Sequence, residues 1–174
     1  MTAFRHADPR YPFLWERAAQ PAGRWHASGE GPAHYFSDTP DGAWAELLRH
    51  EEITEPEDVA GIRRALWAVD LGDEPPERPA LPLQLSTGAP GTYEACQAEA
   101  RRLRARGAAG ITTPSAALLP GAARGWRVDG GLRPGPARDG KVFVLFGVRP
   151  NLTGWIATVA GRPGSELLPR VRHF

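Results

Sequence analysis

Short apolar runs, separated by turns rich in proline and glycine, divide the chain into small elements. Alternating or apolar stretches predict strands at residues 11–18, 33–37, 65–71 and 153–159. The run KVFVLFGV at 141–148 predicts the clearest buried strand, because it is apolar at nearly every position. We expect the strand at 153–159 to pair near it. A further short strand is predicted within 108–121, with a turn at Pro114.

Two helices are predicted from apolar positions at helical spacing. The first has Asp38 or Thr39 as its cap and Pro40 at its first position, and it runs for about three turns. Its apolar side consists of Ala43, Trp44, Leu47 and Leu48. The second helix spans about 92–107, and its arginines indicate a solvated face. Strands and helices mix without a regular strand–helix alternation, which favours an α+β fold over a doubly wound parallel sheet.

Length and composition restrict the classes of protein that fit. With 174 residues, the chain is predicted to form one domain over 1–174. A formal charge of only +1 gives no electrostatic case for nucleic-acid binding, and no apolar run reaches the roughly 18 residues that span a membrane. The N-terminus lacks a secretory signal pattern, so a cytoplasmic location is expected. One cysteine, Cys96, and the absence of zinc-ligand spacing predict neither a disulfide nor a metal site.

Two long segments rich in proline and glycine, 72–91 and 121–140, connect these elements. Loops of this length are uncommon in compact domains unless they have a function. Each segment could therefore close over a binding site, or could be an ordinary surface loop.

Three residues in the stretch 23–50 suggest a binding site. Arg24 lies in a loop or at a strand end, Tyr35 within a predicted strand, and Glu46 on the first helix outside its apolar side. A guanidinium suits phosphate, an aromatic ring offers a stacking surface, and a carboxylate stabilises developing positive charge. Each also has a simpler interpretation, as a surface ion pair, a half-buried strand residue and a solvated helix residue.

The segments GRWH and HYFSDTPDGAWAELLRH, followed later by ITTPSAALLPG, resemble the motifs of the RES domain family. The arginine, glutamate and serine that give the domain its name correspond to Arg24, Glu46 and Ser115, and the family's tyrosine corresponds to Tyr35. Arg17 corresponds to a further arginine, which the family carries on its first strand. The resemblance runs from about residue 15 to 120. It departs from the family at GAARGWRVDGGLRPG, where members often have an asparagine-containing segment.

The resemblance implies a fold related to ADP-ribosyltransferases, with two small β-sheets flanking a cleft for NAD and helices around them. NAD would be a substrate rather than a cofactor, and its nicotinamide–ribose bond would be cleaved by a toxin of a toxin–antitoxin pair. On this assignment Glu46 would stabilise the ribosyl cation or bind a ribose hydroxyl, and Arg24 would bind the pyrophosphate. Tyr35 would pack against nicotinamide or its ribose, and Ser115 would orient Glu46 or the ribose. Water, phosphate or a protein could accept the ADP-ribosyl group. A non-catalytic nucleotide-binding or interaction module is the alternative, and an antitoxin is the expected protein partner.

Overall fold

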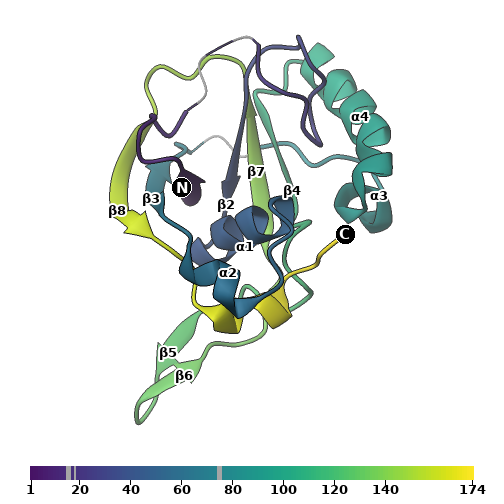
Figure 1. The fold of residues 1–174 in the computed structure, drawn as a ribbon. Helices are drawn as coiled ribbons and strands as arrows, with labels where there is room; N and C mark the ends of the chain where they lie inside the picture. The colour runs from purple at the N-terminus through teal and green to yellow at the C-terminus, as the bar shows by residue number, and fades with distance from the viewer. Residues whose placement is uncertain (15–16, 18, 74–75) are drawn as a thin grey trace.

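The structure is a computed structural model that describes residues 1–14, 17, 19–73 and 76–174 (Figure 1). The strands are β1 (Thr2–Ala7), β2 (Ala33–Ser37), β3 (Arg64–Asp70), β4 (Gly110–Pro114), β5 (Trp126–Val128), β6 (Leu132–Pro134), β7 (Lys141–Phe146) and β8 (Thr153–Gly161). The helices are α1 (Pro40–His50), α2 (Pro56–Ala60), α3 (Leu83–Thr87) and α4 (Tyr93–Ala105), with 3-10 turns η1 (Pro90–Thr92) and η2 (Ser165–Arg170). These elements confirm the predicted α+β class.

One antiparallel six-stranded sheet, in the order β4-β7-β2-β1-β3-β8, forms the centre of the molecule, and β5 and β6 form a separate hairpin. The sheet is nearly divided in its middle, because the register between β1 and β2 consists of the single pair Phe4 and Ser37. On either side, β1 pairs with β3 over six residues and β2 pairs with β7 over five. The structure therefore has one sheet that parts between two halves, where two flanking sheets were expected.

Helices cover one side of each half of the sheet. On β7, Val142 and Val144 pack toward α4, whereas Phe143 and Leu145 face the opposite cluster. Both faces of this strand are buried, which explains its nearly continuous apolar sequence. The apolar side of α1 packs with α2, η2 and Leu66 of β3 in a separate cluster. In Figure 1, α1 accordingly lies near the middle of the molecule, and α4 lies at its right margin beyond β4.

Helix α1 begins as the sequence predicts. The Thr39 side chain accepts a hydrogen bond from the Gly42 backbone N–H at 3.0 Å, and Pro40 occupies the first turn, where no backbone donor is needed. Replacing a threonine cap by alanine typically costs about 1 kcal/mol, so this contact fixes where the helix starts. That start sets the rotation of α1, and hence the direction in which Glu46 points.

Three expectations about strands and connecting segments need correction. The first strand is Thr2–Ala7, and residues 11–14 and 17 form no strand; residues 15, 16 and 18 of the predicted strand lie outside the described residues. The strand β8 exists, but it pairs with β3 at the far end of the sheet from β7. The segments 72–91 and 121–140 also contain regular structure, namely α3 and the β5–β6 hairpin. Within the described part of the chain, no helix is long and apolar enough to cross a membrane.

Candidate functional site

A pocket of about 360 Å³ opens where β1 and β2 part. Its walls come mainly from these two strands, from α1 and from the loop 20–26, with further residues of α4, β4 and β7. Its volume falls within the range of about 300–1,000 Å³ that is usual for small-molecule sites. Arg24, Tyr35 and Glu46 all line it, so the fold brings together three residues that the sequence places in three different elements.

Arg24 lies in a tight turn that the backbones of Gly23 and His26 close, with hydrogen bonds in both directions. The turn directs the Arg24 guanidinium toward the α3–α4 connection, where it donates to the Gly88 carbonyl at 2.8 Å and to the Thr92 hydroxyl at 3.2 Å. The ring of Tyr93 lies beneath it at 4.7 Å. These contacts hold a nearly buried cation in one orientation, and no carboxylate among the described residues is bonded to it.

Tyr35 lines the pocket, and its hydroxyl group is engaged in two hydrogen bonds. His26 Nε2 must donate to the Pro21 carbonyl at 2.9 Å, because a carbonyl can only accept. In the neutral ring, His26 Nδ1 therefore accepts from the Tyr35 hydroxyl at 2.9 Å, and the same oxygen accepts from the Trp25 N–H at 3.0 Å. Burial lowers the pKa of His26, which favours this neutral form. The Tyr35 ring is thus the part available to a ligand.

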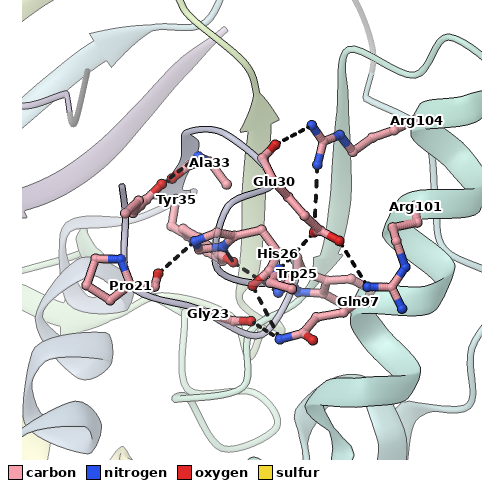
Figure 2. Close-up of polar contacts among 12 residues, drawn as sticks. Pro21, Gly23, Trp25, His26, Glu30, Ala33, Tyr35, Gln97, Arg101 and Arg104 are labelled. Atoms are coloured by element: carbon pink, nitrogen blue, oxygen red, sulfur yellow. Dashed lines mark hydrogen bonds and ion pairs between the residues drawn. The ribbon is translucent and has the colours of Figure 1, made fainter. Parts of the chain in front are cut away.

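Helix α4 anchors the loop that carries Arg24 and His26, as Figure 2 shows. The Gln97 side chain donates to the backbone carbonyls of Gly23 and His26 at 2.9 and 3.3 Å. Glu30, farther along the loop, accepts from Arg101 at 3.0 Å and from the Ala27 backbone N–H at 2.8 Å. The arginines of α4 that were expected to be a solvated face therefore include residues that fix the loop.

Gly23→Ala is expected to reduce ligand binding or turnover at this pocket by about 10- to 100-fold without unfolding the protein. A Cβ at this position would lie 2.8 Å from His26 Cε1 and 2.9 Å from the Tyr35 hydroxyl, so the pair must move, and displacements near 1 Å in a site have effects of this size. Gly91→Ala is the matched control, because no neighbouring atom lies within 4 Å of its Cβ position. Equal activity of wild type and Gly23→Ala would show that the Tyr35–His26 geometry is unimportant.

Glu46 points from α1 into the pocket, and Ser115 stands behind it. The Ser115 hydroxyl lies 3.5 Å from Glu46 Oε1, and it accepts backbone N–H groups of Ala117 and Leu118 at 3.2 and 3.1 Å. Because its lone pairs face these donors, its proton is directed toward the carboxylate. Ser115 is buried and does not line the pocket, unlike Pro114 and Ala116 on either side. Two roles were proposed for Ser115, orienting Glu46 or orienting the ribose, and the first of these fits this geometry.

Burial raises the pKa of Glu46, while Arg49 and Arg24 oppose that rise by favouring the ionised carboxylate. A carboxylate held in this way interacts strongly with positive charge that develops beside it, because little water screens it.

The structure adds two arginines that the sequence analysis did not select. Arg49 lies one turn after Glu46 on α1, and its buried guanidinium donates to the carbonyls of Gly88 at 3.0 Å and Thr87 at 3.3 Å. Arg5 lies on β1, with one guanidinium nitrogen buried and without a hydrogen-bond partner among the described residues. Burial lowers the pKa of Arg5 to about 10, which leaves it charged at neutral pH. The spacing of Arg49 from Glu46 was a usable signal, whereas Arg5 was missed because the first strand was predicted at 11–18.

Arg17, unlike Arg24, Tyr35 and Glu46, does not line the pocket and has no contact with a described residue that does. It is exposed, lies outside any strand and contributes nothing to the pocket wall. Its assignment followed from placing the first strand at 11–18. Since β1 is Thr2–Ala7, the arginine on the first strand is Arg5, which does line the pocket.

The charges of the pocket are unequal, because three arginines face a single glutamate. Arg24 and Arg49 both donate to the Gly88 carbonyl oxygen, so their guanidiniums lie close together. Burial and the neighbouring charge of Arg24 lower the pKa of Arg49. Two neighbouring cations favour an anionic ligand such as a phosphate or pyrophosphate. Gly88 belongs to the segment 72–91, so this segment contacts two pocket arginines, although no described residue of 72–91 or of 121–140 lines the pocket itself.

His6, on the pocket wall, makes the stability of the fold depend on pH. It stacks on Trp44 with ring centroids 6.5 Å apart, and burial lowers its pKa to about 3, helped by the charges of Arg5 and Arg64. An unfolded histidine takes up a proton near pH 6.5, but folded His6 does so only near pH 3. The free energy of unfolding should therefore fall as the pH drops below about 6.5. His6→Phe should lose less stability between pH 7 and 5 in urea titrations, and an unchanged slope would contradict this.

Two comparisons with known proteins found a match, one in sequence and one in structure. The sequence profile of the RES domain matches residues 1–125. The fold is similar to the MbcT toxin in the crystal structure of the M. tuberculosis MbcT–MbcA toxin–antitoxin complex, with a TM-score of 0.58 and 18% identity. That match covers 97% of this chain and 86% of the other. No curated protein sequence matches the chain.

Proposed function

The chain belongs to the RES domain family, and on this premise we propose that it consumes NAD by cleaving the bond between nicotinamide and ribose. The observation that carries the proposal is the pairing of two kinds of charge in one pocket. Arg24 and Arg49 meet at the Gly88 carbonyl, and Glu46 lines the same pocket. Binding a pyrophosphate requires the two neighbouring arginines, and stabilising a ribosyl cation requires the carboxylate of Glu46.

The chemistry assigns a role to each charge. When nicotinamide leaves, it takes the electron pair of the C–N bond, and the ribose becomes an oxocarbenium-like cation. The Glu46 carboxylate stabilises that cation, as a carboxylate does in glycoside hydrolysis. Arg24, with Arg49 beside it, holds the pyrophosphate away from the reacting carbon and so fixes the ribose near Glu46. An acceptor then adds to the cation and, if the acceptor is water, releases a proton.

Two further residues act by positioning. The Tyr35 ring packs against nicotinamide or its ribose, because its hydroxyl group is held by His26 and Trp25. Ser115 keeps Glu46 in its rotamer through the 3.5 Å contact. Phosphates that bind Arg24 and Arg49 would compete with the Gly88 carbonyl for the two guanidiniums, so nucleotide binding would change how the chain around Gly88 is held.

We further propose that this chain is the toxin of a toxin–antitoxin pair and has an inhibitory protein partner. MbcT, which shares the fold, was crystallised with its antitoxin. Unrestrained cleavage of NAD would be costly to the cell that makes the enzyme, so an active enzyme of this type requires restraint.

Product analysis tests the proposal. The purified protein is incubated with NAD alone, with NAD and phosphate, and with NAD and candidate target proteins. The products are then resolved by chromatography and mass spectrometry. Release of nicotinamide in any arm supports the proposal, and the form of the ADP-ribosyl product identifies water, phosphate or protein as the acceptor. Tight NAD binding without release of nicotinamide in any arm would indicate the non-catalytic binding module instead.

A further inference from the structure

One aromatic side chain, Phe174, reaches the pocket wall from a segment that no role described so far involves. The backbone of 170–172 is hydrogen-bonded to that of 117–119, with N–H to carbonyl distances of 2.7 and 2.9 Å. Val171, in the middle of this segment, is buried in the cluster around α1. The fold therefore holds the chain firmly two residues before Phe174, and this attachment directs the ring to the pocket.

The Phe174 ring lies on the guanidinium of Arg49, with its centroid 4.4 Å from the guanidinium carbon. Tyr93 lies in the same way on Arg24, at 4.7 Å. The two arginines both donate to the Gly88 carbonyl, which is the place proposed above for a pyrophosphate. Each arginine of the pyrophosphate site therefore has an aromatic ring beside it.

The two rings differ in how far they are exposed. Tyr93 is the first residue of α4 and is half-buried, so its main contact is with Arg24. Phe174 is 51% exposed, although Arg49 covers part of its ring. Of the phenylalanine, tyrosine and tryptophan residues that line the pocket within the described chain, only Phe174 is exposed. The uncovered part of its ring is therefore available to a planar group of a ligand.

We propose that Phe174 stacks on the adenine base of a bound dinucleotide, an inference that rests on the proposed function for the identity of the ligand. In NAD the pyrophosphate lies between two nucleosides. The nicotinamide ribose must lie at Glu46, because the cation forms there, and Glu46 is less exposed than Phe174. The adenosine does not react, so it extends from the arginines toward the open part of the pocket, where the Phe174 ring is exposed.

This position divides the recognition of the ligand between two kinds of side chain. The guanidiniums bind the charged phosphates, whereas an uncharged ring suits an uncharged base, because bases stack on aromatic side chains. Stacking on a base that is remote from the reacting bond is equally strong in the bound substrate and in the transition state. Phe174→Ala should therefore raise KM for NAD and leave kcat nearly unchanged.

Titration of the purified chain with ADP and with pyrophosphate separates the base from the phosphates. We expect Phe174→Ala to weaken ADP binding by about 5- to 20-fold and to change pyrophosphate binding by less than about twofold, while Phe174→Trp keeps the wild-type affinity for ADP. Tyr11→Ala is the matched control, because Tyr11 is another exposed ring beside an arginine, 5.6 Å from Arg10, and does not line the pocket. It should bind both ligands as the wild type does.

Three results would overturn the proposal. Equal losses for ADP and pyrophosphate in Phe174→Ala would mean that the ring only supports Arg49, and unchanged affinity for ADP would mean that it contacts no base. A wild-type protein that binds ADP no more tightly than pyrophosphate, or binds neither, would have no site for the base. Neither ligand contains the nicotinamide–ribose bond, so ADP binding that depends on Phe174 would stand even if no nicotinamide were released from NAD.

Discussion

Glu46→Gln is expected to lower the turnover of NAD by about 100- to 1,000-fold, with little change in the affinity for NAD. Glutamine keeps the shape and the contact with Ser115, but removes the charge that stabilises the ribosyl cation. Loss of one preorganised electrostatic group in other enzymes has an effect of this size. Because the cation develops only in the transition state, kcat should fall while Kd remains nearly constant. Nicotinamide release and calorimetric titration with NAD measure the two quantities.

Two controls separate this result from a loss of folding. Glu51→Gln changes an exposed glutamate at the end of the same helix and should leave turnover unchanged. The folded protein raises the pKa of Glu46, so folding opposes its ionised form, and Glu46→Gln should not lower the melting temperature at pH 7. Any gain in stability should disappear below about pH 4.3, where an unfolded glutamate is also protonated. Full turnover by Glu46→Gln would remove Glu46 from catalysis.

Arg24→Lys is expected to weaken NAD binding by about 10- to 100-fold. Charge-assisted hydrogen bonds contribute about 1.5–3 kcal/mol each, and lysine replaces the planar fork by a single ammonium that cannot grip a pyrophosphate in the same way. Lysine also loses one of the two contacts that hold the side chain, to Gly88 and Thr92. The loss should appear in Kd from titration with NAD, measured in the presence of a catalytically inactivating Glu46→Gln change.

Arg17→Lys is the matched control for this substitution, because Arg17 is exposed and lies away from the pocket. It should bind NAD as the wild type does. Equal affinity in Arg24→Lys would mean that Arg24 does not hold the pyrophosphate, and a loss in Arg17→Lys would restore the sequence-based assignment.

The sequence predicted those elements whose signals are local. The cap at Thr39, the proline after it and the apolar side of α1 all lie within one short stretch, and the continuous apolar run of β7 reflects burial on both faces. Strand β1 was missed because Arg5 and His6 interrupt its apolar pattern, and these residues face the pocket. The predicted pairing of β8 with β7 was wrong, because the sequence of a strand does not indicate which distant strand it pairs with.

The candidate site divides in the same way. Glu46 was identifiable because it lies on a helix but outside the apolar side of that helix. Arg49 follows it on α1 by about one turn. Arg5 was missed because the arginine of the first strand was assigned within 11–18, whereas the first strand is β1. That the Tyr35 hydroxyl is occupied by other groups of the protein also depended on the structure, because His26 and Trp25 contact it only after the loop folds.

The most direct test of the central claim follows nicotinamide and bound NAD in the same sample of purified wild-type protein. With NAD in excess over enzyme, and phosphate present in one of two otherwise identical reactions, we expect many molecules of nicotinamide released per chain and a parallel loss of NAD. Saturable binding of NAD with no nicotinamide released in either reaction, or no binding at all, would contradict it.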